Sequence, residues 1–448
     1  MKGGYLSMLD LLASILGLCL KAYSAYFVVI AAFAFRRNKG IQRHTPQTRF
    51  ACLIAARNEE DVIGKLIHSL RAQNYPDDLY DIFVIPNNCT DQTEKAARIA
   101  GAKILHCMGR VTKKGDALHE AIACLLPQDY DAFCVFDADN IVHEDFLARM
   151  NDALSSGVRI ARGAMKVKNP YDSWISGCYG LYFTLMDLFF NRARTNCGLS
   201  ARLNGTGFAV HREVLEKMGG WNTDTIAEDA EFYTFCVLHG YRICFVPKAI
   251  TFDEATNSFA ISMIQRMRWC SGIMDVSQKK TPELLSASVR TGGRRAWDTI
   301  MIINGSFVQV ASICPPLLSF FKAVGNGSFL SLCASFGVGL VFSWLGCILL
   351  AAALAWVGGY RDRKILKTVL CYPLFTASWL PLNVISLLHR TKNWKVIPHG
   401  QKNVRARDLL LQESNYPQPN YPRRTYKKSD YPQKAERRQK AAPQWTER

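Results

Sequence analysis

The sequence predicts one α/β domain inserted between apolar segments that are long enough to cross a membrane. Apolar residues make up 49% of the 448 residues, and they gather in long runs at 4–35 and 299–389. Between these runs, short β-branched or aromatic stretches alternate with segments of helical period. This alternation is typical of a parallel sheet covered by helices, so we predict a membrane protein with one α/β domain.

The first apolar segment, at 5–35, is long enough to cross a bilayer once, although Asp10 and Lys21 interrupt it. It is too long for the apolar core of a signal peptide, and basic residues follow it instead of a cleavage site. Those residues are Arg36, Arg37, Lys39 and Arg43. By the positive-inside rule, we expect a transmembrane helix within 1–40, an outer N-terminus and a cytoplasmic domain after it.

Residues 48–257 form the predicted α/β domain, in which three strand-like runs each end at a polar cluster. The runs are FACLIAA, DIFVIPN and AFCVFDA, and the clusters are 57–60, 87–91 and 137–140. Ligands of parallel sheets bind beyond the carboxyl ends of the strands. We therefore expect the three clusters to converge on one edge of the sheet.

The remaining segments are predicted from hydropathy and charge. Residues 299–390 are expected to hold the C-terminal transmembrane segments. Within this range, 299–322 and 331–357 are long enough to span, whereas the crossing of 368–389, which contains two prolines, is left open. The tail at 401–448 has 12 basic and 5 acidic residues, so we expect it to be disordered and close to anionic lipids.

Composition and missing motifs exclude several classes of protein. The chain carries a formal net charge of +18 and 15 scattered cysteines, without Cys-x-x-Cys or zinc-type spacing. The cysteines are therefore expected to be free thiols in a reducing compartment. The sequence contains no P-loop, Gly-x-Ser-x-Gly or His-Glu-x-x-His motif. It therefore lacks the motifs that usually identify P-loop NTPases, serine hydrolases and zincins. We expect no nucleic-acid partner.

Asp137 and Asp139 are the most informative acidic pair. Two carboxylates one residue apart, at the end of a strand, can both reach one Mg²⁺ or Mn²⁺ ion. Phosphate oxygens of a nucleotide would complete the coordination of that ion. The alternative is a helix cap with a solvated turn, which needs no ligand.

Glu228 and Asp229 begin a segment of helical period. An acidic pair at a helix N-terminus ordinarily compensates the helix dipole. The functional alternative is that one carboxylate acts as a general base toward an acceptor hydroxyl in the cleft.

Gln265, Arg268 and Trp269 lie on one face of a predicted helix, and Arg266 lies elsewhere. On that face the guanidinium can bind a pyrophosphate, and the indole offers a platform for a sugar ring. Cation–π packing or anchoring at the membrane interface would explain the same pattern without a ligand. Lys114 and the turn at 204–207 are further candidates for contact with a phosphate.

Taken in order, seven motifs of this chain resemble those of the membrane-embedded processive family 2 glycosyltransferases, which include cellulose, hyaluronan, chitin-oligosaccharide and poly-N-acetylglucosamine synthases. The motifs are AARNEE, NNCTD, KKGDAL, FDADN, LNGTGF, AEDAEF and QRMRW, and together they cover about 50–272. The resemblance implies a cytosolic GT-A (Rossmann-like) domain between transmembrane helices. It also implies amphipathic interface helices at 258–295 that carry the Q-x-x-R-W motif.

The resemblance also implies roles for single residues. Ala55, Arg57 and Glu59 match the segment that lines the uridine pocket, and Asp91 closes the second nucleotide-binding turn. Lys114 matches a lysine near the donor, and Asp137 and Asp139 match the carboxylates at the diphosphate and its metal. Asp229, beside Glu228, matches the catalytic base. Gln265, Arg268 and Trp269 match the residues at the pyrophosphate and the acceptor. The sequence departs from the pattern at Asn87, where relatives have Asp, and at Ala227, where they have Thr.

The implied activity is inverting transfer of a hexose or N-acetylhexosamine from a UDP-sugar to a growing polysaccharide, with Mg²⁺ or Mn²⁺ as cofactor. The alternative is single transfer to a lipid, as in ceramide glucosyltransferase, and a non-enzymatic nucleotide-binding scaffold is a third possibility that the intact acidic residues disfavour. The expected partners are the donor, a saccharide or lipid acceptor, the bilayer of the plasma membrane and an accessory export subunit. The sugar, the linkage and the number of spans stay open.

Overall fold

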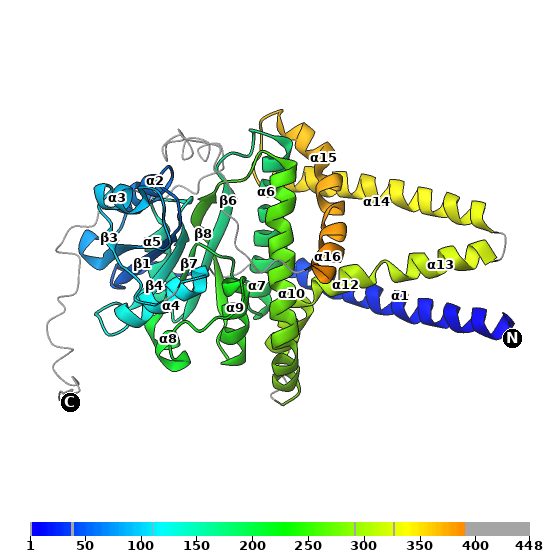
Figure 1. Ribbon diagram of the computed structural model, residues 1–448, viewed down its shortest axis with the longest axis horizontal. Helices are drawn as coiled ribbons and strands as arrows, with labels where there is room; N and C mark the ends of the chain where they lie inside the picture. The colour runs from blue at the N-terminus through cyan, green and yellow to red at the C-terminus, as the bar shows by residue number, and fades with distance from the viewer. Residues whose placement is uncertain (1, 37–39, 110, 291–292, 326–327, 390–448) are drawn as a thin grey trace.

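The computed structural model describes residues 2–36, 40–109, 111–290, 293–325 and 328–389. The basic tail expected at 401–448 lies outside these ranges. The centre of the molecule is an eight-stranded sheet in the order β3-β2-β1-β4-β7-β6-β8-β5 (Figure 1). The strands are β1 Phe50–Ala56, β2 Tyr80–Pro86, β3 Lys103–Ile104, β4 Ala132–Asp137, β5 Ile141–Val142, β6 Ile160–Val167, β7 Phe208–His211 and β8 Ile243–Asp253.

The sheet is mixed, whereas the sequence pattern predicted a parallel one. Strands β1 to β4 are parallel, but β7 runs antiparallel between β4 and β6, and β5 pairs antiparallel with β8. Because β7 runs in the opposite direction, it begins at the edge where β4 ends, with Val135 opposite Phe208. The loop before β7 therefore reaches the polar cluster that follows β4.

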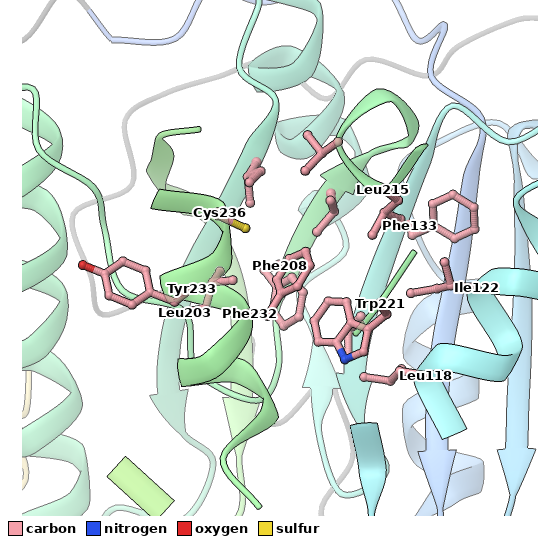
Figure 2. Close-up of a cluster of buried hydrophobic side chains, with 14 of the residues drawn as sticks. Leu118, Ile122, Phe133, Leu203, Phe208, Leu215, Trp221, Phe232, Tyr233 and Cys236 are labelled. Carbon is pink, nitrogen blue, oxygen red and sulfur yellow. The ribbon is translucent and has the colours of Figure 1, made fainter. Parts of the chain in front are cut away.

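Helices cover both faces of the sheet. The pleat sends Leu53 of β1 to one face and Cys52 to the other, and each belongs to a separate hydrophobic cluster. The helices that flank the strands are α2 Ile63–Arg71, α3 Thr93–Ile99, α4 Lys114–Leu125, α5 Phe146–Ser155, α8 Arg212–Met218 and α9 Glu228–Leu238. The ring of Trp221 stacks with that of Phe232, with centroids 3.9 Å apart, and with that of Phe208, with centroids 6.0 Å apart (Figure 2). This aromatic stack joins α9 to β7 beside the edge where the site lies.

The helices that lie beyond the sheet are α1 Lys2–Ala32, α6 Trp174–Leu185 with the π-helix η3 Met186–Arg192, α7 Ala193–Cys197, α10 Phe259–Arg290, α11 Arg294–Ile303, α12 Gly305–Ala311, α13 Cys314–Gly325, α14 Phe329–Val357, α15 Ile365–Ala377 and α16 Trp379–Leu388. Most of the exposed large hydrophobic side chains lie on α1, α13 and α14. Four helical segments are long and apolar enough to cross a membrane: Leu11–Phe35, Gly305–Val324, Cys333–Val357 and Ile365–Leu388. The first span after the domain begins at Gly305, later than the 299 expected, because Thr299 and Ile303 of α11 are buried in the domain.

The four candidate spans differ in direction. Helices α1, α13 and α14 leave the same side of the domain and run outward together (Figure 1). The fourth segment, α15 and α16, instead runs across them, and α16 packs along α10. The region expected to hold several interface helices is mostly α10, which continues past Pro282 without ending.

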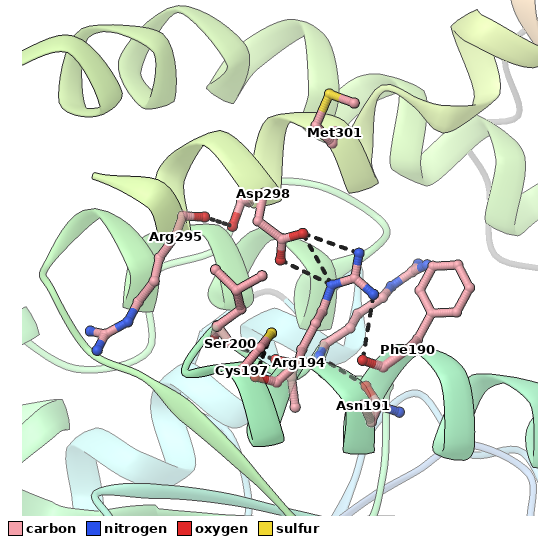
Figure 3. Close-up of polar contacts among 12 residues, drawn as sticks. Phe190, Asn191, Arg194, Cys197, Ser200, Arg295, Asp298 and Met301 are labelled. Atoms are coloured by element: carbon pink, nitrogen blue, oxygen red, sulfur yellow. Dashed lines mark hydrogen bonds and ion pairs between the residues drawn. The ribbon is translucent and has the colours of Figure 1, made fainter. Parts of the chain in front are cut away.

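A buried ion pair fastens α1 to the domain. Arg194 of α7 donates three hydrogen bonds of 2.9 to 3.2 Å to the carboxylate of Asp298 in α11 (Figure 3). Tyr26 of α1 donates to the same carboxylate at 2.8 Å. The side chains of Arg194 and Asp298 are 1% and 0% exposed, so this pair has no access to a ligand.

Candidate active site

A continuous cavity of about 1690 Å³ opens at the edge where β1, β2 and β4 end. Eleven of the twelve residues singled out from the sequence line it: Ala55, Arg57, Glu59, Lys114, Asp137, Asp139, Glu228, Asp229, Gln265, Arg268 and Trp269. From the strand ends, the cavity continues between α6, α10 and α16 to residues of α1 and α12. One space thus joins the polar edge of the sheet to the apolar helices.

Asp91 is the sequence-predicted residue that is not among the residues lining the cavity. Its carboxylate accepts hydrogen bonds from the amide and hydroxyl of Thr93 and from the amide of Glu60, at 2.5 to 3.2 Å. Burial raises the pKa of Asp91, but these hydrogen bonds outweigh it and hold the pKa below its ordinary value. Asp91 therefore braces the two loops that follow β1 and β2, while Asn87 of the same motif faces the cavity.

The loops after β1 and β2 each contain an asparagine in the left-handed backbone conformation, and a hydrogen bond joins the two loops. Asn58 and Asn88 have φ angles of 58° and 50°, a conformation that Asn tolerates better than most residues. The amide of Thr90 donates to Asn58 Oδ1 at 2.8 Å, which closes the contact between the loops. Ala55, Arg57 and Glu59 are held in place at this end of the cavity.

Lys114 binds the first carboxylate of the acidic pair. Its Nζ lies 2.5 Å from Asp137 Oδ1, 2.5 Å from the carbonyl oxygen of Gly205 and 3.6 Å from Glu228 Oε1. Burial lowers the pKa of Lys114, but the charges of Asp137 and Glu228 outweigh it and hold the pKa above its ordinary value. A Cβ on Gly205 would lie 3.2 Å from Asp137 Oδ2, so a side chain there would crowd the ion pair.

Glu228 and Asp229 open α9 beside this pair. Burial raises the pKa of Glu228 to about 7, and the positive charge of Lys114 opposes the rise. Burial also raises the pKa of Asp229, while the charge of Arg202 across the cavity lowers it. The Asp229 carboxylate accepts a hydrogen bond of 2.7 Å from the amide of Ala230. Both acids line the cavity, so they are available to a bound substrate.

Asp253, at the end of β8, is a site residue that sequence reasoning missed. Asn140 donates to its Oδ1 at 3.1 Å and to Asp139 Oδ1 at 3.4 Å, so the amide links the two carboxylates. Burial raises the pKa of Asp253 well above its ordinary value, and the charges of Asp139 and Asp137 add to the rise. No short motif marks Asp253, because β5 and β8 bring it there from far along the chain.

The residues present fit a divalent cation that arrives with its substrate. Within the described ranges, no group of three or more His, Cys, Asp or Glu side chains forms a ready-made metal cage. Mg²⁺ is commonly bound by one or two carboxylates with phosphate oxygens, and Asp137 and Asp139 both line the cavity. Asp253 adds a third carboxylate beside this pair, linked to Asp139 through the Asn140 amide.

Two arginines of helix α10, Arg266 and Arg268, lie in different surroundings. Arg268 lines the cavity, where burial lowers the pKa of its guanidinium and the charges of Glu228 and Asp137 oppose that shift. Arg266 is fully buried on another face, where it donates to the Ser378 hydroxyl at 2.8 Å and to the Phe375 carbonyl at 3.1 Å. Arg266 thus holds the junction between α15 and α16 against α10.

Three aromatic rings stack in the wall of the cavity. The rings of Trp269 and Trp379 lie 6.3 Å apart at 26°, and those of Trp379 and Tyr182 lie 5.7 Å apart at 30°. Tyr179 donates a hydrogen bond of 2.8 Å to Gln265 Oε1 beneath them. Trp379 and Tyr182 were not found from the sequence, since they come from helices far from the motif in the chain.

Comparison with known proteins places this site in a family. Residues 46–272, just over half of the chain, match the model described as glycosyltransferase-like family 2. The chain is 29% identical over 277 residues to a beta-monoglucosyldiacylglycerol synthase of Nostoc sp., a match that covers 59% of this chain and 57% of that protein. It is 22% identical over 257 residues to a poly-beta-1,6-N-acetyl-D-glucosamine synthase of Staphylococcus epidermidis, covering 56% of this chain and 60% of that protein.

The matches therefore span less than two thirds of either curated relative. Among solved structures, the fold is similar to that of a mannosyltransferase from Pyrobaculum calidifontis, solved with GDP-Man and Mn²⁺. The TM-score is 0.59 at 18% identity, covering 85% of this chain and 99% of that one. The likeness supports the GT-A fold found here, with its mixed sheet and apolar helices. The chain belongs to glycosyltransferase family 2.

Proposed function

We propose that this enzyme transfers a hexose or N-acetylhexosamine, with inversion, from a UDP-sugar to the hydroxyl of a lipid acceptor that enters from the membrane. The observation that carries the proposal is the continuity of the cavity from the acidic cluster to α1, α12 and α16. A lipid can enter between apolar helices while its headgroup reaches Asp229. The similarity to monoglucosyldiacylglycerol synthase supports the same choice.

In the proposed reaction, the acceptor hydroxyl gives its proton to the carboxylate of Asp229 as its oxygen attacks the anomeric carbon. The bond from that carbon to the diphosphate breaks in the same step, so UDP leaves with the bonding electrons. Arg268 and Lys114 would bind the negative diphosphate, and Asp137 and Asp139 would hold the cation. When bound, Mg²⁺ or Mn²⁺ would supply positive charge to the diphosphate.

In the same proposal the uracil and ribose bind at Ala55, Arg57 and Glu59, and Gln265 and Trp269 face the acceptor. The cationic residues after α1 favour a cytoplasmic catalytic domain with helices that cross the plasma membrane. The proposal needs no accessory export subunit, for which the relatives give no support.

Polysaccharide synthesis is the second candidate function, and the stacked rings of Trp269, Trp379 and Tyr182 favour it, because flat aromatic surfaces bind sugar rings. The outward-directed helices α13 and α14 weigh against it. Leu340 and Leu349 of α14 are 68% and 71% exposed, and no described residue of α13 or α14 is among those that line the cavity.

The test is to place the purified full chain in phosphatidylcholine vesicles that contain diacylglycerol. The vesicles receive UDP-glucose, UDP-galactose or UDP-N-acetylglucosamine with Mg²⁺ or Mn²⁺, and the products are separated by size. A single glycolipid supports the proposal, whereas a ladder of long saccharides supports the second candidate. Transfer should stop in EDTA and return with excess metal, and full activity in EDTA would remove the cation from the scheme.

A further inference from the structure

Two amide side chains meet at the end of the cavity that lies among the apolar helices. Asn383 of α16 donates from Nδ2 to Oε1 of Gln309 in α12 at 2.5 Å. Both residues line the cavity, and Asn383 is only 2% exposed. Each belongs to a segment that is apolar enough to cross a membrane, where polar side chains are costly without a hydrogen-bond partner.

The pair does not use all of its hydrogen-bonding capacity. Asn383 Oδ1 is buried and has no hydrogen-bond partner among the described residues. The amino group of Gln309 likewise has no partner within the described part of the chain. The pair thus offers one acceptor and one donor at the cavity wall, which is the complement of a hydroxyl group. A buried acceptor left unpaired is expensive, so a ligand hydroxyl that binds there would gain affinity.

The surroundings indicate an uncharged ligand. Trp379 lies one helical turn before Asn383, so its ring and the amide share a face of α16. Asp275 and Lys279 of α10, which also line the cavity, pair with each other at 3.2 Å. Lys114 pairs with Asp137, and the charges of Glu228 and Asp137 act on Arg268, so both cations are engaged by the acidic cluster.

We propose that Asn383 and Gln309 form the subsite for the headgroup of the acceptor, and that this headgroup is an uncharged, hydroxyl-bearing glycerol or glycosyl group carried by a lipid. The inference rests on the proposed function and adds to it the chemical class of the acceptor. The amides orient the headgroup by hydrogen bonds, and the Trp379 ring packs against its carbon face. The lipid tails extend along α1, whose Tyr23 and Phe27 line the cavity.

A structural role alone makes a different prediction. Hydrogen bonds between amides also hold membrane helices together, so the contact could serve only to join α12 to α16. In that case, its removal would lower the melting temperature and would not change the KM for one class of acceptor.

The deciding experiment uses the full chain with Asn383→Leu, which keeps a similar volume and removes both polar atoms. The acceptors are diacylglycerol, a monoglucosyl diacylglycerol and phosphatidate in phosphatidylcholine vesicles, and a soluble oligosaccharide. The matched control is Ser312→Ala at the end of α12, where the hydroxyl is exposed and does not line the cavity. Gln309→Leu tests the second amide.

We expect Asn383→Leu to raise the KM for the neutral lipids roughly threefold to tenfold, as for the loss of one or two neutral hydrogen bonds. The KM for the UDP-sugar and the release of UDP without acceptor should stay unchanged, and Ser312→Ala should match the parent enzyme. An unchanged acceptor KM in both leucine variants overturns the subsite, as does a preference of the parent enzyme for phosphatidate. A preference for the oligosaccharide overturns the lipid source.

The two levels of the proposal fail in distinguishable ways. If the parent enzyme transfers sugar to none of these acceptors, the proposed function itself is wrong. If it transfers to diacylglycerol while Asn383→Leu changes only the melting temperature, the proposed function stands and the subsite is wrong.

Discussion

Among the buried charges of the described residues, two groups have opposite character. The Arg194–Asp298 pair is closed, because the guanidinium and Tyr26 occupy the carboxylate and the rings of Phe27 and Phe190 lie 5.4 and 4.9 Å from the guanidinium. The cluster around Lys114 and Asp137 is open, because one side faces the cavity. There, burial shifts the pKa of Glu228 to about 7.

The difference separates stability from chemistry. A closed pair already meets its hydrogen-bonding needs, so it can only hold helices together. An open cluster of carboxylates carries charge that a substrate, a proton or a cation can still compensate. The following substitutions would sharpen or break this distinction, from the largest expected effect to the smallest.

In the open cluster, Asp229→Asn should lower turnover roughly 10²–10⁴-fold, the usual cost of losing a general base. The amide keeps the shape of the carboxylate but cannot accept a proton at neutral pH. Initial rates of UDP release, with UDP binding by calorimetry as the control, measure the effect. The binding constant and the melting temperature should barely change. Parent-like turnover would show that another group accepts the proton.

In the closed pair, Asp298→Asn should lower the free energy of unfolding by about 3–5 kcal/mol, because it leaves the Arg194 guanidinium buried without its counter-charge. Activity per folded molecule should stay close to that of the parent. Thermal unfolding in detergent measures the loss. The double variant Arg194→Met with Asp298→Leu should recover much of the stability. Full activity loss in a stably folded Asp298→Asn enzyme would contradict the structural role.

Glu228→Gln tests the pH dependence of the open cluster. In the folded state the Glu228 pKa is about 7, above its ordinary value of 4.5, so the folded state holds the proton more tightly between these values. The stability of the parent should therefore fall as the pH rises through this window, whereas the glutamine variant lacks this loss.

Above pH 7, the variant should gain on the order of 3 kcal/mol over the parent, relative to their difference below pH 4.5. Melting temperatures of both proteins between pH 4 and pH 8 would measure it. A constant difference across that range would mean that Glu228 is not forced toward its neutral form.

The smallest effect is expected at an exposed pair. Arg98 and Glu94 lie on the surface of α3 with an N–O distance of 2.8 Å, and their side chains are 58% and 38% exposed. Arg98→Ala should change the free energy of unfolding by less than about 0.5 kcal/mol and leave turnover unchanged, because solvent screens such pairs. Chemical denaturation and a standard transfer assay would measure both. A loss of several kcal/mol in Arg98→Ala would show that the distance between two charges, and not their burial, determines how much an ion pair contributes to the free energy of unfolding.

Much of the fold follows from local sequence pattern. The runs FACLIAA, DIFVIPN and AFCVFDA form β1, β2 and β4, since β-branched and aromatic residues pack well on a buried sheet. The polar ends of these strands fix where Ala55, Arg57, Asp137 and Asp139 lie, because parallel strands end at one edge. The spacing of Gln265, Arg268 and Trp269 likewise places them on one face of α10, turned toward the cavity.

Other features depend on contacts between segments that are distant in the chain. The direction of β7, the approach of Asp253 to Asp139 and the stacking of Trp379 on Trp269 join residues with no common motif. Asp91 shows the converse. Its motif predicted a residue of the nucleotide-binding turn, and in the structure its carboxylate accepts hydrogen bonds from Thr93 that hold this loop in place.

The sequence alone thus determined three of the eight strands, the acidic pairs and the face of α10, because these depend on the pattern of a single segment. Only the tertiary structure decided which charges are closed and which are open, and which amides of α12 and α16 meet. The reason is physical: burial and hydrogen bonding are set by all the atoms around a group, and most of those atoms belong to other segments.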